Sequence, residues 1–185
     1  MVNIQFYPIP YRDTARREAI VAQALQEAYN QYVSSLSQTP AVRPLFFNDL
    51  LLAGASSSVV TEAGIVFSTV TASASTFNLT SQAIITFTTP NNKVYNFYGI
   101  ADEAANPSLR VWVMTIAGTV YNPIYLLPSL VTNEDKEFIL NGTFRPIPPN
   151  TTVTISLYGN ATSSVTEQID FLGYVAETPP SLPTA

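Results

Sequence analysis

The sequence contains no histidine and no cysteine in 185 residues. Histidine is the side chain that most often titrates near neutral pH, and cysteine is a strong nucleophile. Their absence excludes serine and cysteine triads of the usual kind, typical zinc sites and c-type haem attachment. Charge is also scarce, because only 11% of the residues are Asp, Glu, Lys or Arg, against about a quarter in an average domain. The composition therefore predicts a structural or binding protein rather than an enzyme.

Neutral polar side chains must fill most of the surface instead. Such a surface repels little, so it suits packing against copies of the same chain or binding of neutral ligands. The net charge is −5, with +1 in residues 1–43 and −6 in residues 44–185. The acidic body argues against nucleic-acid binding. The slightly basic N-terminal region could face an internal membrane, or it could be a solvated helix face.

The N-terminal sequence carries no basic, apolar pattern typical of a signal peptide. No segment reaches the ~18 consecutive apolar residues of a membrane span. We therefore expect the chain to be made and folded in a cytoplasm.

Three regions are predicted along the chain. Residues 1–40 hold an extended arm, with Pro8 and Pro10, and then a helix over 13–36 that Asp13 or Thr14 can cap. Residues 41–177 form the body, and the Pro-rich residues 178–185 form a C-terminal arm. The helix has an apolar stripe that could lie on its own domain or on a neighbouring subunit, and it consists of Ala22, Leu25, Tyr29, Tyr32 and Leu36.

The body reads as all-β. Candidate strands are 45–52, 64–71, 82–89, 93–100, 109–117, 119–127, 136–140, 152–158 and 168–176. Tight hairpins are predicted at Ala117-Gly118, at Asn141-Gly142 and at 90–93. Alternation is clear near the end, where Val153, Ile155 and Leu157 share one face. Short alternating strands joined by short turns indicate a sandwich or a barrel.

Carboxylates are the remaining catalytic candidates. Asp102 with Glu103, and Glu134 with Asp135 and Glu137, lie in polar, turn-like sequence, where acids usually stay solvated. Calcium could use Asn133, Glu134 and Asp135, or Asp102, Glu103 and Asn106, but neither run matches a known loop signature. Asp170 lies within a strand, where it could accept a hydrogen bond or meet an arginine. We expect no catalytic residue, no metal and no cofactor.

Aromatic residues offer a candidate binding face. Rings on a sheet can stack on sugars or anchor a protein partner. The alternative is an ordinary sandwich core with cross-strand pairs. The residues concerned are Tyr95, Phe97, Tyr121 and Tyr125.

The layout of an arm, a helix, short strands and an extended tail resembles the small single jelly-roll capsid proteins of tailless icosahedral viruses. The stretch 144–155, FRPIPPNTTVTI, followed by 169–175, IDFLGYV, is similar to the closing strands of many viral structural domains. The resemblance implies a jelly-roll-type β-sandwich of about eight strands preceded by an amphipathic helix. It also implies that sheet faces and terminal arms mediate assembly.

These observations predict a self-associating structural protein of a virion, whose partners are copies of itself and other capsid proteins. The alternative is a receptor- or carbohydrate-binding module, such as a spike or fibre tip, whose tyrosine-rich face binds a sugar.

Overall fold

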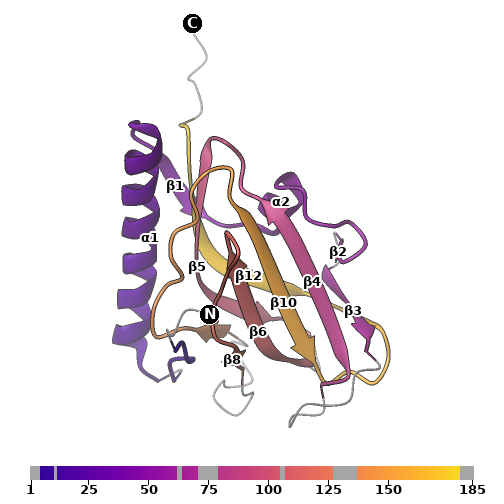
Figure 1. The fold of residues 1–185 in the computed structure, drawn as a ribbon. Coiled ribbons are helices and arrows are strands. Elements are labelled where there is room, and N and C mark those ends of the chain that lie inside the picture. Colours follow the sequence, from indigo (N-terminus) through magenta and orange to yellow (C-terminus); the bar gives the residue numbers. More distant parts are fainter. Residues whose placement is uncertain are drawn as a thin grey trace, which may run out of the picture.

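The computed structural model describes residues 5–10, 12–61, 64–70, 79–104, 107–126 and 137–179. Within these ranges the chain forms a two-layer β-sandwich of jelly-roll type with a long helix along one outer face (Figure 1). The elements are α1 (Thr14–Leu36), β1 (Ala41–Pro44), α2 (Phe47–Leu52), β2 (Val60–Thr61), β3 (Gly64–Thr69), β4 (Ser81–Thr88), β5 (Lys93–Asp102), β6 (Leu109–Ile116), β7 (Thr119–Val120), β8 (Ile124–Tyr125), β9 (Glu137–Ile139), β10 (Thr152–Gly159), β11 (Val165–Glu167) and β12 (Ile169–Glu177).

The two layers have different sizes. The four-stranded sheet has the order β1-β12-β5-β9, and the eight-stranded sheet contains β11-β3-β4-β10-β6-β7, with β2 beside β3 and β8 beside β6. The strands outnumber the eight or so that were predicted, because several are segments of two or three residues. The prediction of a sandwich with an N-terminal helix is confirmed.

The core fills the space between the layers. The predicted inward positions Val153, Ile155 and Leu157 are all fully buried. Trp112, also fully buried, packs edge-on against Phe144 with ring centroids 5.0 Å apart. Aromatic pairs of this geometry add to the free energy gained from burial alone.

Helix α1 packs on its own sandwich, along the outside of the sheet that contains β5 and β12 (Figure 1). As predicted, Asp13 caps it, with its carboxylate accepting the backbone N–H of Arg16 at 3.2 Å. The buried face differs from the predicted stripe, and consists of Arg17, Ile20, Ala24, Ala28 and Tyr32.

Only Tyr32 of the predicted stripe belongs to that buried face. Leu36 packs in part, Tyr29 is half-buried, and Ala22 and Leu25 are exposed. The sheet accepts the narrow face that carries the small residue Ala24, whose carbonyl accepts a hydrogen bond from the Asn96 side chain at 3.0 Å. The prediction followed the bulkiest apolar residues, which lie on the adjacent flank of the helix.

Three local predictions were wrong. Residues 47–52 form α2 rather than part of a strand, because the Asp49 carboxylate accepts the Phe46 N–H at 2.9 Å and caps a helix. The turn at 90–93 links β4 in one sheet to β5 in the other. Asn141-Gly142 closes no hairpin, since β9 pairs with β5 and the Asn141 side chain accepts the Tyr7 N–H. The hairpin at Ala117-Gly118 is confirmed by the pairing of β6 with β7.

The described part of the N-terminal arm also packs on its own domain. Phe6 enters the core beside Phe144, at 4.8 Å between ring centroids, and the Ile9 N–H donates to the Ile139 carbonyl at 2.7 Å. The tail beyond residue 179 lies outside the described residues. No helix in the described ranges is long and apolar enough to cross a membrane.

Candidate functional site

A groove forms where β1 stops. β1 pairs with β12 from Ala41 opposite Glu177 to Pro44 opposite Tyr174, and the Leu45 N–H then donates to the Gly173 carbonyl at 2.9 Å. Beyond that point the chain leaves the sheet and enters α2. The space beside the first half of β12 has a volume of about 840 Å³, within the usual range for small-ligand sites. Its described lining is Pro44, Leu45, Phe46, Phe47, Asn48, Gly64, Tyr98, Gln168, Asp170, Phe171, Leu172 and Gly173.

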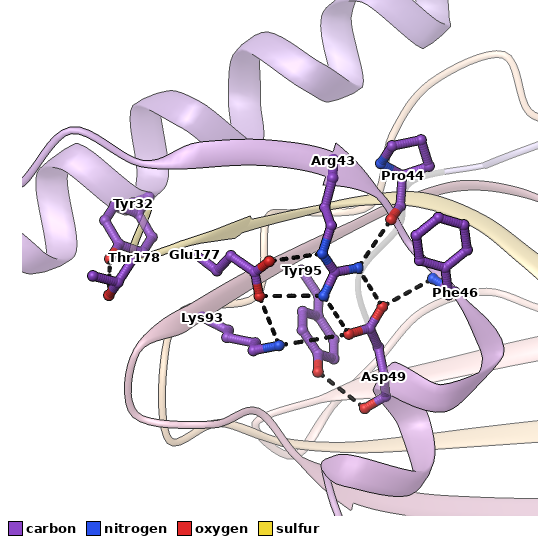
Figure 2. Close-up of polar contacts among 9 residues, drawn as sticks. All are labelled: Tyr32, Arg43, Pro44, Phe46, Asp49, Lys93, Tyr95, Glu177 and Thr178. Atoms are coloured by element: carbon purple, nitrogen blue, oxygen red, sulfur yellow. Dashed lines mark hydrogen bonds and ion pairs between the residues drawn. The ribbon is translucent and has the colours of Figure 1, made fainter. Parts of the chain in front are cut away.

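One wall of the groove is held by a charge network (Figure 2). Arg43 on β1 lies between two carboxylates, donating to Asp49 through Nη1 and Nη2 at 2.8 and 2.7 Å and to Glu177 through Nε at 2.7 Å. Lys93 completes the network with its Nζ 2.7 Å from Glu177 and 3.6 Å from Asp49. The network ties β1, α2, β5 and β12 together, so the loop that carries Phe46 starts from a fixed base.

The network also sets the ionisation of its members. Burial acts to raise the pKa of Asp49, but hydrogen bonds from Arg43 and the Phe46 N–H outweigh it and hold that pKa below its ordinary value. The hydrogen bond from Arg43 is the main reason that the pKa of Glu177 is also lowered. Because both pKa values are lowered, both carboxylates remain charged into the acidic range. Tyr95 also contacts this network, since its buried hydroxyl donates to the Asp49 carbonyl at 3.0 Å.

The groove itself combines a ring with neutral and acidic hydrogen-bonding groups. Phe46 is 58% exposed, and the Arg43 guanidinium carbon lies 5.6 Å from its ring centroid, which supports the ring from the network side. Tyr98 lies on the sheet and pairs with Tyr174 at 5.8 Å. Asn48 and Gln168 add amide groups to the lining. Together they offer a stacking surface beside groups that both donate and accept hydrogen bonds.

Asp170 is the one acid among the described lining residues. Burial, and after it the charge of Glu103, raises the pKa of Asp170. Burial is also the main reason that the pKa of Tyr98 rises to about 12. Tyr98 therefore keeps its proton under all ordinary conditions and can donate a hydrogen bond, while Asp170 can accept one.

The predicted aromatic face lies elsewhere, and three of its four residues are not at the surface. Tyr95 and Phe97 are fully buried and Tyr121 is nearly so, so these rings belong to the core. Tyr125 is 47% exposed, on β8. The core alternative therefore holds for all but Tyr125. Tyr95 and Phe97 are buried because β5 is covered by the sandwich on one face and by α1 on the other, and Tyr121 packs against Phe144 at 5.3 Å between ring centroids.

Sequence reasoning missed Phe46 and Asn48 as site residues. The sequence pattern predicts a strand over residues 45–52, and nothing in a strand there indicates that Phe46 and Asn48 are exposed. The available signal was Asp49 three residues after Phe46, the spacing of a helix cap. Of the other acids considered, Glu137 bonds Arg17 at 3.1 Å, whereas Asn106 and residues 133–135 lie outside the described residues. No group of three or more His, Cys, Asp or Glu side chains is arranged for a metal ion in the described ranges.

Comparisons with known proteins find similarity in fold alone. No protein-family model matches the sequence, and no curated protein does. A family 35 carbohydrate-binding module from an environmental isolate aligns at a TM-score of 0.33 with 10% identity, over 71% of this chain and 94% of that one. A Paenibacillus cycloisomaltooligosaccharide glucanotransferase complexed with cycloisomaltoheptaose aligns at a TM-score of 0.26 with 15% identity, over 63% of this chain and 17% of the enzyme.

The catalytic domain of a GH87 α-1,3-glucanase in complex with nigerose aligns at a TM-score of 0.27 with 13% identity, over 83% of this chain and 28% of that one. The chain thus spans only a small part of either enzyme.

Proposed function

We propose that the protein is a non-catalytic binding module whose groove beside β12 takes a neutral carbohydrate. The observation that carries the proposal is the exposed ring of Phe46 in a groove that also holds Asp170, Tyr98 and two amide side chains. A sugar presents an apolar C–H face and a rim of hydroxyl groups. It therefore needs a ring to stack on and nearby groups that donate and accept hydrogen bonds.

Binding without turnover is favoured by the acids of the groove. Glycoside hydrolysis requires two carboxyl groups that face the same bond from opposite sides. Asp170 is the sole acid among the described lining residues, and Glu103, whose charge acts on it, is not one of them. A single carboxylate suits hydrogen bonding to sugar hydroxyls.

The test is binding of neutral oligosaccharides to the purified chain, first on a glycan array and then by calorimetry. Phe46→Ala is expected to weaken binding about tenfold or more, since a stacked ring contributes at least ~1.4 kcal/mol. Asp170→Asn should weaken it as well. Leu52→Ala is the matched control, because Leu52 is an apolar residue of the same region, 75% exposed, that does not line the groove.

If Phe46→Ala and Asp170→Asn leave sugar binding unchanged, the proposed site is refuted. A sugar that is converted to products during the incubation would show that the module is an enzyme.

A second candidate function, a self-associating subunit of a virion, is favoured by the eight-stranded sheet. β3, β4, β7, β8 and β10 contain no Asp, Glu, Lys or Arg, so Arg110 and Glu167 are the only charged residues in its strands. Its outer face instead pairs hydroxyls across strands, as between Thr86 and Thr154 at 3.2 Å. Ile84 on the same face is 44% exposed.

A face without charge can meet a copy of itself without repulsion or the cost of burying ions. The exposed flank of α1 offers further apolar area, with Leu25 at 40% and Val33 at 38% exposure. Light scattering and electron microscopy test this candidate. If it holds, the wild type forms large assemblies and Ile84→Lys prevents them. A protein that stays monomeric at every concentration contradicts it.

A further inference from the structure

Asp170 brings a carboxylate without a protein partner into the groove beside β12. The side chain is half-buried and lines the groove. Its carboxylate makes no hydrogen bond or ion pair within the described part of the chain. Leu172, two positions further along β12, lies on the same face of the sheet, because alternate residues of a strand point the same way. The carboxylate therefore lies beside apolar surface on which a sugar ring can rest.

The groove offers no positive charge to balance this carboxylate. None of the described residues that line it is Lys or Arg. The charge network in the adjoining wall contains two basic and two acidic side chains, which pair with one another. Its charges therefore cancel, and its basic groups are already occupied.

A second acidic residue lies next to the lining. The Glu103 N–H donates to the carbonyl of Gln168, a lining residue, at 2.8 Å. The negative charge of Glu103 also acts on Asp170. The groove therefore presents net negative charge to a ligand.

A ligand with a positive group suits such a groove better than a neutral one. A half-buried carboxylate has lost part of its hydration, and an ammonium group can replace the lost water with charge-assisted hydrogen bonds. A sugar hydroxyl can also donate to the carboxylate, but a bond between two charged groups is about twice as strong as one between neutral groups. A carboxylate on the sugar would instead be repelled.

We propose that the groove selects sugars by charge and binds an amino sugar with a free ammonium group more tightly than the corresponding neutral sugar. This inference rests on the proposed sugar site and adds the preferred class of ligand to it. Asp170 accepts hydrogen bonds from the ammonium group, while the exposed ring of Phe46 stacks on the C–H face of the sugar. An acidic sugar is bound less tightly than a neutral one.

The experiment is calorimetry on the full chain with four oligosaccharides of the same linkage and length, built from glucose, N-acetylglucosamine, glucosamine or glucuronic acid. The buffer is near pH 7, between the ordinary pKa values of about 4 for a carboxyl group and about 8 for an amino group. We expect the glucosamine oligosaccharide to bind about tenfold more tightly than that of glucose, and that of glucuronic acid to bind more weakly. The N-acetylated sugar carries a larger substituent without charge, so it controls for size.

Salt and two variants assign the preference to one charge. At about 1 M salt, where the screening length falls to about 3 Å, the advantage of the glucosamine oligosaccharide should shrink while binding of the glucose oligosaccharide stays the same. Asp170→Asn keeps a similar shape and removes a charge that no described residue balances, so it should fold and bind the two sugars within about twofold of each other. Glu18→Gln, on the exposed side of α1, removes one charge outside the groove and should keep the preference.

The outcomes separate this inference from the sugar site itself. If the glucose oligosaccharide binds and that of glucosamine binds no more tightly, selection by charge is wrong while the sugar site stands. A preference that is as large in Asp170→Asn as in wild type also overturns the inference. If none of the four sugars binds, the proposed function is wrong and the inference fails with it.

Discussion

Replacing Arg43 by methionine tests whether the charge network holds the groove wall. Methionine keeps most of the apolar stem and removes the guanidinium, which donates to Asp49, to Glu177 and to the Pro44 carbonyl. The substitution leaves the buried carboxylate of Asp49, whose side chain is only 3% exposed, without its main partner. Its carboxylate keeps the Phe46 N–H at 2.9 Å and Lys93 at 3.6 Å.

The expected cost follows from these contacts. Removing one partner of a fully buried ion pair costs about 3–5 kcal/mol. The Arg43 side chain is 30% exposed and Lys93 remains nearby, so we expect a smaller loss, about 2–3 kcal/mol. For a chain of this length the melting temperature should fall by about 5–10 °C.

Urea unfolding followed by tryptophan fluorescence measures this loss, because Trp112 is the sole tryptophan and is fully buried. A variant that also carries Asp49→Asn should recover part of the loss, since no buried charge is then left without its partner. Arg43→Lys should be intermediate, because an ammonium group cannot bond two carboxylates in the same fork geometry. An Arg43→Met protein within about 0.5 kcal/mol of wild type, the range of ordinary surface changes, would refute this account of the network.

Three further predictions follow from the same structure. The pKa values of Asp49 and Glu177 are lowered in the folded state. The ionised carboxylates therefore stabilise the fold above the unfolded pKa of about 4, and this contribution is lost as the pH falls through the folded pKa values. The urea midpoint should drop more steeply below about pH 5 in wild type than in Arg43→Met. Gly173→Ala should lower the free energy of unfolding by about 2–3 kcal/mol or prevent folding, because the new Cβ would clash with the Asn96 carbonyl oxygen. At Gly118 no atom lies within 4 Å of an added Cβ, so Gly118→Ala should lower it only by the backbone strain, about 1 kcal/mol. Tyr95→Phe should lower the free energy of unfolding by about 1 kcal/mol by removing the hydrogen bond to the Asp49 carbonyl. Thermal melts of Gly173→Ala, Gly118→Ala and Tyr95→Phe measure these effects.

The sequence predicted the elements whose pattern is local. Helix α1 shows a cap and an uninterrupted run of helix formers, and β10 shows strict alternation, so their bounds and the inward residues Val153, Ile155 and Leu157 could be predicted. Many such strands predicted a sandwich or a barrel, and the jelly-roll type was implied by the resemblance to small capsid proteins. The side of α1 that is buried could not be predicted, because the close approach of Ala24 depends on Asn96, 72 positions later in the chain.

The candidate site was less accessible to prediction. Its groove exists because β1 ends opposite Tyr174, which leaves space beside the earlier residues of β12. The lining comes from residues 44–48, from Gly64 and Tyr98, and from Gln168 with residues 170–173, and no local pattern joins these segments. The exposure of the aromatic rings could not be predicted either, since Tyr95 and Phe97 of β5 are fully buried while Phe46 is 58% exposed.

The most direct test of the proposed function is the affinity of the purified chain for neutral oligosaccharides, measured by calorimetry on wild type, Phe46→Ala, Asp170→Asn and Leu52→Ala. The groove predicts that wild type and Leu52→Ala bind the same sugar with equal affinity, and that the two groove variants bind it at least about tenfold more weakly. Equal affinity in all four proteins, or no sugar bound by any of them, would contradict a carbohydrate site beside β12.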